Sequence, residues 1–393
     1  MKVAIVIPND FGIEQFCKVL VELLRNGGKN EIYAICDVHL DNSQTQHTNA
    51  LASLGVVHVP VKYFRFFSIT QDLLYLLALF GIFRRERFDM VVTIATKPNI
   101  YGSVVAKIAG VKKVACSVWG LGVTFADDGG LKRKLFQKLV LFLYWIAFRL
   151  SDKVWFTNEF DFNWFISMGI VKPPKVFLTK NYVNTDEYFP DCVNAVQKAS
   201  LRQELGLTQE DRVVVMVARM SWAKGVREFA EAAAILRDKR PAIKFILIGP
   251  LDDGSPDSVP ESYLREHAGH ANFTWTGFRK DVHVFYAISD VVVLPTYYRE
   301  GGFPRGLTEA MAMGKPIIAS NSVHCRGTVD EGKNGYLVPI RDSEALANAI
   351  VKIVEGNCRE AFGQHSRLKA LDEFDERKIV TGVVKEFLQI NPL

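Results

Sequence analysis

The chain has 393 residues, of which about half are hydrophobic, and a formal net charge of +5. This length exceeds one ordinary hydrophobic core and predicts two domains of roughly 150–200 residues each. The six cysteines include no C-x-x-C pair, which argues against a disulfide framework or a structural zinc and favours a reducing cytoplasm. We expect no signal peptide, and no apolar run reaches the ~18–20 residues that span a bilayer.

Short β-branched segments alternate with helical patterns along the chain, which is typical of parallel sheets with crossover helices. The first series of predicted strands comprises residues 2–8, 31–38, 56–60, 89–95, 112–120, 153–158 and 175–180. After a polar segment, the second series comprises residues 212–218, 244–250, 272–277, 291–296, 316–320 and 335–339. This pattern predicts an α/β protein with two doubly wound, Rossmann-like domains that face each other across a cleft, with ligands at the carboxyl ends of the strands.

The polar segment sets the predicted domain boundaries. We predict an N-terminal domain over 1–190 and a C-terminal domain over 191–374. The remaining helix, 375–393, has no strand after it, and we expect it to pack across the domain junction.

Positive charge is concentrated in one part of the chain. Residues 51–150 hold 14 Lys and Arg against 5 Asp and Glu. They also contain the two most apolar helical segments, 71–88 and 131–150, each with basic residues at or near one end. Such a segment is either a core helix with solvated ends or a helix that lies on an anionic membrane. The occurrence of two in one basic region favours membrane docking.

Charged residues follow the first strand of the second series. Arg219 comes just after that strand, and Lys224 with Gly225 stands five residues later, where a helix begins. Two cations beside a helix N-terminus suit a diphosphate. Farther along, Gly277 and Phe278 follow the strand at 272–277, where exposed backbone groups could contact a nucleobase.

Two carboxylates, Glu300 and Glu309, follow the strand at 291–296, with eight residues between them. Glu309 begins a helix rich in small residues, where an acid is often only a capping or dipole partner. Glu300 lies in a loop whose glycines allow backbone N–H groups to approach a ligand. Three such signals at the ends of three strands of one sheet together indicate a binding site.

Other polar clusters have simpler explanations. The acidic segment 251–257 follows a strand and contains Gly, Ser and Pro, so we predict a solvated turn. The histidines at 267, 270 and 283 have no cysteine or histidine partner nearby, and we predict no metal site.

These motifs resemble family 4 retaining glycosyltransferases of the GT-B fold, which carry an R-x4-K-G phosphate motif and an acidic pair. The segments "KPNIYGSVVAKIAG", "GLGVTFADDGG" and "VWFTNEFD" are similar to a subgroup that adds sugars to undecaprenyl-diphosphate-linked acceptors, including an N-acetylgalactosaminyltransferase. The family spaces its acids by seven residues, so this chain has one extra residue at or just before Gly301.

The resemblance implies a role for each matching residue. Arg219 and Lys224 would stabilise the leaving diphosphate, with Glu300 beside the donor sugar and Glu309 on the ribose hydroxyls. The implied donor contacts also include Gly12, Gly277, Phe278, Gly301, Gly302 and Phe303. The implied acceptor or sugar contacts are Lys97, Asn99, Gly120, Asp127 and Asn158.

The implied reaction is metal-independent transfer, with retention, of a sugar from a UDP-sugar to a polyprenyl-diphosphate-linked saccharide in bacterial glycan assembly. The donor would be a co-substrate and no cofactor is expected. The resemblance places the chain in the cytoplasm, peripheral on the inner face of the cell membrane. Nucleic acid is not an expected partner, because the basic residues interleave with aliphatic runs. The alternatives are a transferase with a small-molecule acceptor and a catalytically weak scaffold that binds nucleotide-sugars.

Overall fold

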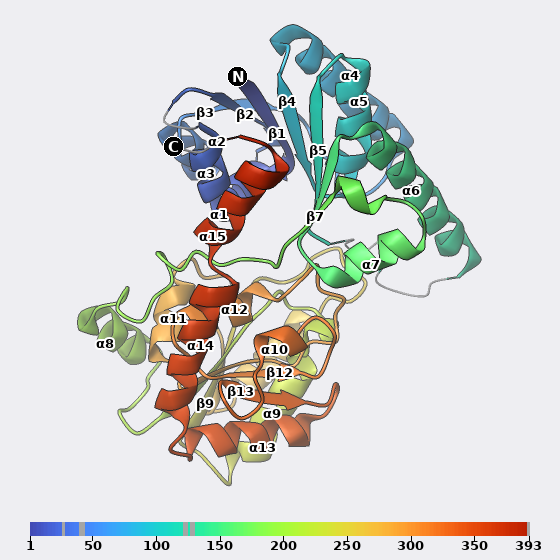
Figure 1. Cartoon of the computed structure of the whole chain (residues 1–393). Helices are drawn as coiled ribbons and strands as arrows, with labels where there is room; N and C mark the ends of the chain where they lie inside the picture. Colours follow the sequence, from blue (N-terminus) through green and yellow to red (C-terminus); the bar gives the residue numbers. More distant parts are fainter. Residues whose placement is uncertain (26–27, 39–43, 121–124, 126–129, 391–393) are drawn as a thin grey trace. The chain divides into compact units, whose positions relative to one another are not determined.

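The computed structural model describes residues 1–25, 28–38, 44–120, 125 and 130–390, without the side chains of 44–48. The chain forms two compact units: Met1–Lys180 with Arg377–Leu393, and Asn181–Glu376. Each unit is built on one parallel sheet, as the alternation of strands and helices predicts (Figure 1).

The first unit contains a seven-stranded sheet with the order β3-β2-β1-β4-β5-β6-β7. Each strand corresponds to a predicted apolar segment, and the central ones are buried on both faces, as parallel strands between helical layers are. The strands are β1 (Lys2–Asn9), β2 (Glu31–Asp37), β3 (Val56–Pro60), β4 (Met90–Ile94), β5 (Lys113–Val118), β6 (Lys153–Phe156) and β7 (Val176–Leu178).

The helices of the first unit connect these strands and supply its final element. Three of them, α4, α5 and α6, lie together along one side of the sheet (Figure 1). The helical elements are α1 (Asp10–Phe16), α2 (Lys18–Arg25), α3 (Gln44–Ser53), α4 (Ile69–Glu86), η1 (Pro98–Gly102), α5 (Ser103–Ile108), α6 (Leu131–Leu150), α7 (Glu159–Ser167), η3 (Pro173–Lys175), α15 (Glu376–Gly382) and η6 (Val383–Phe387).

The second unit contains a six-stranded sheet with the order β10-β9-β8-β11-β12-β13. The strands are β8 (Arg212–Val217), β9 (Ile243–Ile248), β10 (Phe273–Trp275), β11 (Val291–Leu294), β12 (Ile317–Ser320) and β13 (Gly335–Val338). The helical elements are α8 (Ala195–Glu204), η4 (Trp222–Lys224), α9 (Val226–Arg237), α10 (Glu261–Ala268), α11 (Val282–Ile288), α12 (Arg305–Ala312), η5 (Arg326–Thr328), α13 (Ser343–Val354) and α14 (Arg359–Glu373).

The order of each sheet reverses once, which creates a position where neighbouring loops leave in opposite directions. In the second sheet this position lies between β8 and β11, and in the first between β1 and β4. Ligands of doubly wound sheets bind outside the carboxyl ends of such strands. We therefore expect a ligand site at the loops after β8 and β11.

The first segment of the first unit ends at Lys180, ten residues before the end expected at 190, and the chain returns to this unit at Arg377. The final helical segment has contacts with the first unit. Arg377 pairs with Glu22 at 3.0 Å, and the rings of Phe177 and Phe387 stack with centroids 5.7 Å apart.

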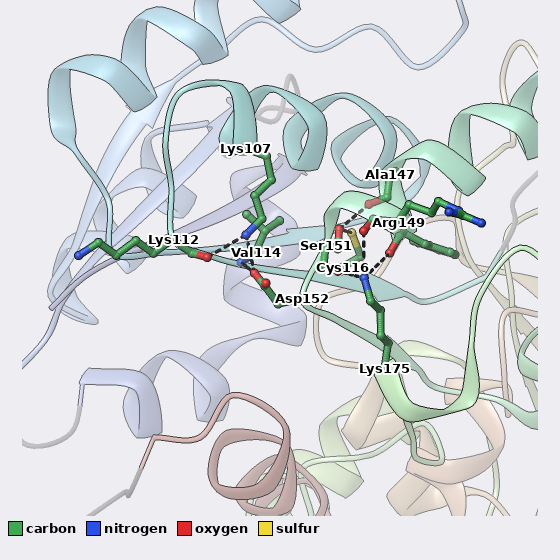
Figure 2. A network of polar contacts seen from close by, with 10 residues as sticks. Lys107, Lys112, Val114, Cys116, Ala147, Arg149, Ser151, Asp152 and Lys175 are labelled. Carbon is green, nitrogen blue, oxygen red and sulfur yellow. Dashed lines mark hydrogen bonds and ion pairs between the residues drawn. The ribbon is translucent and has the colours of Figure 1, made fainter.

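A polar network fixes the C-terminal end of α6 (Figure 2). The Lys175 ammonium group donates to the backbone carbonyls of Arg149 at 2.9 Å and Ser151 at 2.7 Å, which are among the last carbonyls of the helix region. Beside it, the Asp152 carboxylate accepts from Lys107 Nζ at 2.7 Å and from the Val114 amide at 2.8 Å. These bonds join α6 to α5, β5 and the segment before β7. Within the described part of the chain, no helix is both long and apolar enough to cross a membrane.

Candidate functional site

The loop after β8 carries the two predicted phosphate-binding cations. Arg219 follows the strand and donates through Nη1 to Asp252 Oδ1 at 2.6 Å. Lys224 ends the 3₁₀ turn η4, and its Nζ lies 2.7 Å from both carboxylate oxygens of Glu300. Each cation is therefore held by a carboxylate from another loop.

Gly225 allows this loop to approach the end of β11. Its φ is +87°, and a Cβ at this position would lie 2.3 Å from the carbonyl oxygen of Pro295. The amides of Tyr297 and Tyr298 both donate to the Ala223 carbonyl, at 2.8 and 2.9 Å. Because β8 and β11 are neighbours at the reversal of the sheet order, these contacts join the two loops where a ligand is expected.

Glu300 is buried and lies between the two loops. Thr296 Oγ1 donates to Glu300 Oε1 at 3.1 Å, beside the bonds from Lys224. Gly302 has a φ of +128°, and a Cβ there would lie 2.5 Å from the Asn181 side chain. The loop that contains Gly301 thus brings the Glu300 carboxylate to Lys224.

Tyr298 lies beside both cations. Lys224 Nζ is 4.7 Å from the centroid of its ring. Burial raises the pKa of the Tyr298 hydroxyl, and the positive charge of Arg219 acts in the opposite direction. This tyrosine therefore remains a neutral contact for both cations at physiological pH.

Glu309 lies on α12 and is buried against α11. Its Oε2 accepts from the Tyr286 hydroxyl at 3.1 Å, and its Oε1 accepts from Arg305 Nε at 3.1 Å, one helical turn earlier. Burial raises the pKa of Glu309, while Arg305 and Tyr286 lower it. Each oxygen of an ionised carboxylate can accept a further bond, so hydroxyl groups of a ligand could still be recognised.

The acidic segment 251–257 is a turn with Asp253 and Gly254 exposed, as predicted, but two of its acids bond to the loop after β8. Asp252 is buried, with 7% of its surface exposed, and pairs with Arg219. Asp257 accepts from the Ser221 hydroxyl, and the Ala223 amide donates to the same carboxylate oxygen at 3.0 Å. This segment follows β9, the other neighbour of β8, and its bonds hold the loop after β8.

The remaining predicted donor residues of this unit lie in nearby loops. Gly277 follows β10, has a φ of +69° and accepts from the Gly249 amide at 2.9 Å, while the next residue, Phe278, is 53% exposed. Phe303 packs edge-on against Phe374 with ring centroids 5.3 Å apart. Its carbonyl accepts from the Asn181 side chain at 3.2 Å.

In the first unit, Lys97 follows β4 and is buried, with 2% of its surface exposed. Its Nζ donates to the carbonyls of Phe64 and Phe66 at 2.8 and 2.7 Å and to Asp72 Oδ1 at 2.5 Å. An ammonium group has three donors, and all three have protein acceptors. An acceptor contact by Lys97 would require one of these bonds to break.

Two predicted asparagines of the first unit also have local structural bonds. Asn99 is fully buried; its Oδ1 accepts from Thr93 at 2.7 Å, and its Nδ2 donates to the Ser117 carbonyl at 2.8 Å. Asn158 caps α7 by accepting from the Asp161 amide at 2.7 Å. Asn99 therefore connects the carboxyl ends of β4 and β5, and Asn158 fixes the start of the helix that follows β6.

The other predicted residues of the first unit lie at the same edge of its sheet. Gly12 is buried in α1 directly after β1, and its amide donates to Asn9 Oδ1 at 3.1 Å. Gly120 follows β5 and has a φ of +115°. Asp127 lies outside the described residues.

Several site residues escaped the sequence analysis: Asp252, Asp257, Tyr286, Thr296, Tyr298 and Arg305. Only Asp252 and Asp257 carried a usable signal, since they too follow a strand at the edge where Arg219 lies. Among the residues that the structure describes, no group of three or more His, Cys, Asp or Glu side chains is arranged to hold a metal ion.

Comparison with family models assigns the chain to a protein family. Residues 197–369 match the model of glycosyl transferases group 1, and residues 30–158 match that of the glycosyl transferase 4-like family. The chain belongs to the family 4 glycosyltransferases. The first match contains the loop after β8 and both predicted acids, so the candidate site described above lies in the part of this glycosyltransferase that its family shares.

Two bacterial relatives align with most of this glycosyltransferase. One, from Campylobacter jejuni, is N,N'-diacetylbacillosaminyl-diphospho-undecaprenol alpha-1,3-N-acetylgalactosaminyltransferase, 27% identical over 91% of this chain and 90% of its own length. Another, from Escherichia coli, is UDP-Gal:alpha-D-GlcNAc-diphosphoundecaprenol alpha-1,3-galactosyltransferase, 26% identical over 80% of this chain and 79% of its own.

The fold is GT-B, as predicted. The crystal structure of the Anabaena protein HepE with UDP and glucose has a TM-score of 0.79, with 19% identity and 99% of each chain covered. A glycosyltransferase from Rickettsia africae has a TM-score of 0.77, with 17% identity over 99% of this chain and 98% of its own.

Proposed function

We propose that this glycosyltransferase moves a hexose or N-acetylhexosamine, with retention, from a UDP-sugar to a polyprenyl-diphosphate-linked saccharide in bacterial glycan assembly. The pairing of Arg219 and Lys224 with acids from neighbouring loops is the observation that carries the proposal. The acceptors named for the two bacterial relatives support the choice of acceptor.

The proposed chemistry uses the side chains of the second unit. The donor diphosphate would take over bonds of Arg219 and Lys224, which would then stabilise the negative charge that develops as the nucleotide leaves. Glu300, released from Lys224, would accept from hydroxyls of the donor sugar, and Glu309 from those of the ribose. Two fixed cations could supply this neutralisation without a metal ion.

Retention in this proposal follows from attack on the face from which the diphosphate leaves. A donor phosphate oxygen would receive the proton of the acceptor hydroxyl, so the reaction would not need a protein base. Rate acceleration would come from orientation of the acceptor and from charge stabilisation. We further propose that the enzyme works at an anionic membrane surface, where its lipid-linked acceptor lies.

The proposal is tested by incubating the enzyme with a panel of nucleotide-sugars and short polyprenyl-diphosphate saccharides, with and without EDTA. We expect UDP release that depends on both substrates and is unchanged by EDTA, and a product whose anomeric configuration, read by NMR, matches the donor. Donor binding without turnover would support the scaffold alternative. Turnover on a free saccharide but on no lipid-linked one would support a small-molecule acceptor.

A further inference from the structure

Two helices of the first unit expose an apolar stripe with the same spacing. On α4 and α6 the exposed residues recur at positions i, i+4, i+8 and i+11, which is one face of a helix. Their exposed fractions lie between 40% and 91%, although each helix already buries another apolar face in the core. The two outer stripes are Ile69, Leu73, Leu77 and Phe80 on α4, and Leu131, Leu135, Leu139 and Phe142 on α6.

The segment before α4 joins these two stripes. We call residues 61–68 the aromatic loop, because four of its eight residues are aromatic. Its Phe67 packs edge-on against Phe136 of α6, with ring centroids 5.0 Å apart. Its Phe64 and Phe66 are 37% and 60% exposed. The stripes therefore begin on either side of a set of aromatic rings, and the exposed apolar residues extend from one helix to the other.

Lys97 holds the aromatic loop in this shape. The loop carbonyls of Phe64 and Phe66 both accept from its ammonium group, as does Asp72 of α4. The other oxygen of Asp72 accepts from the Tyr101 hydroxyl at 3.1 Å and the Ser68 amide at 3.2 Å. The buried ion pair between Lys97 and Asp72 thus ties the loop to α4 and η1. The loop can therefore expose Phe64 and Phe66 while its backbone stays fixed.

Neighbouring elements also hold α4 and α6 in place. Contacts of α5 with both α4 and α6 keep the two helices along one side of the sheet (Figure 1). The network around Lys175 and Asp152 anchors the C-terminal end of α6 (Figure 2). The exposed stripe of α6 starts at the opposite end, near the aromatic loop.

The charges around the exposed apolar residues favour an anionic membrane as the binding partner. The sequence of α6 contains five Lys and Arg and no Asp or Glu, and its Lys132, Lys134 and Lys138 are exposed around the stripe. The aromatic loop adds the exposed Lys62 and Arg65. A second copy of this chain would bring the same cations against each other. An anionic lipid surface instead offers phosphates to the cations and acyl chains to the apolar side chains.

We propose that the aromatic loop and the outer stripes of α4 and α6 form a surface that inserts into the interfacial region of an anionic bilayer, with Lys97 as the residue that positions the loop. This surface would be the membrane contact of the enzyme, and its biological role rests on the proposed function. It gives the buried Lys97 a positioning role behind this surface, in place of the acceptor contact that the family resemblance implies.

Flotation of the full-length enzyme with vesicles tests the surface. The wild type should float with vesicles of phosphatidylglycerol and phosphatidylcholine, and much less with phosphatidylcholine alone or at 1 M salt, where charges are screened beyond about 3 Å. The variant Phe66→Ser/Leu73→Ser/Leu135→Ser should lose at least about tenfold in vesicle affinity, because each change removes a large apolar side chain from the interface. All three positions are exposed, so the fold does not depend on them.

A matched variant and a second substrate separate the possible outcomes. Val196→Ser/Leu368→Ser removes two side chains that are 76% and 66% exposed in the second unit, and it should float like the wild type. Turnover of a short-chain acceptor in detergent should be equal in the surface variant and the wild type. Equal flotation of the surface variant and the wild type would overturn the proposed surface. Flotation without turnover of any lipid-linked acceptor would instead overturn the proposed function and leave the surface intact.

The role of Lys97 has its own readout. Phe66→Trp should show quenching by brominated lipids in anionic vesicles, beyond the quenching measured for the parent protein. Adding Lys97→Met together with Asp72→Asn, which avoids a buried unpaired charge, should reduce that quenching severalfold while UDP binding persists. Undiminished quenching would overturn the positioning role of Lys97. A wild type that sediments as a dimer, does not float, and becomes monomeric in the surface variant would show that a second copy occupies the surface.

Discussion

Lys97, which is buried, and Lys224, which is partly buried, each lie next to a carboxylate at the carboxyl ends of a parallel sheet, one in each unit. Lys97 donates to three protein oxygens, two of them backbone carbonyls that cannot move without the aromatic loop. Lys224 bonds to the two oxygens of one carboxylate and faces the Tyr298 ring. The difference lies in what a ligand must displace: loop backbone at Lys97, but a single side chain at Lys224.

This comparison predicts that the two lysines have different roles. We expect a lysine that donates to two backbone carbonyls and a carboxylate to fix local structure, and a lysine held by one carboxylate alone to exchange that partner for a phosphate. Arg219 resembles Lys224, because it also pairs with one carboxylate, that of Asp252. The following predictions test this distinction, from the largest expected effect to the smallest.

Lys97→Met should reduce the free energy of unfolding by about 3–5 kcal/mol, the range observed when one partner of a buried ion pair is removed. The cause is the Asp72 carboxylate, which remains buried without its cation. Urea denaturation measures the change. Lys112→Met, at an exposed position, serves as control and should stay within about 0.5 kcal/mol of the wild type. If Lys97→Met unfolded at the wild-type midpoint, the structural role of Lys97 would be refuted.

Lys224→Ala and Arg219→Ala should each lower turnover by ~10²–10³-fold, as removal of a group that stabilises transition-state charge does. The measurement is the rate of UDP release at saturating donor and acceptor. Lys239→Ala, at an exposed position of the same unit, should retain the wild-type rate. Near wild-type rates in both site variants would contradict the phosphate assignment.

Asp252→Asn should strengthen UDP binding about three- to tenfold, because the Asp252 carboxylate competes with the diphosphate for Arg219 and adds a like charge beside it. Isothermal titration calorimetry measures the affinity. The neighbouring residue offers a matched control, since Asp253 is exposed and Asp253→Asn should have little effect. Weaker binding by Asp252→Asn would mean that orientation of Arg219 outweighs the competition.

Lys315 extends the comparison to a lysine that donates to two carbonyls, those of Ala287 and Ser289 at 2.9 and 3.0 Å. Burial lowers its pKa from 10.5 to about 8. Between these pH values the unfolded chain binds more protons at this residue than the folded chain, so its contribution makes the free energy of unfolding rise with pH. Lys315→Met should remove that contribution in urea titrations from pH 7.5 to 10. An unchanged pH slope would contradict the lowered pKa.

Much of this architecture could be predicted because parallel strands buried on both faces read as short continuous apolar runs. The placement of Arg219, Lys224 and Glu300 followed from their positions after strands. Their partners could not be predicted in the same way. The pairing of Arg219 with Asp252 depends on where the loops after β8 and β9 lie in space, and the segment 251–257 alone reads as an ordinary turn. Likewise, nothing local to Lys97 shows that Phe64 and Phe66 supply its acceptors.

The central claim is that Arg219 and Lys224 form a diphosphate site by exchanging their carboxylate partners for the donor. Calorimetric titration of UDP into the wild type and into Arg219→Ala/Lys224→Ala, in metal-free buffer, tests it most directly. We predict saturable binding by the wild type and an affinity at least about 100-fold lower in the double variant, while vesicle flotation remains unchanged. Equal UDP affinity in the two proteins would contradict the account.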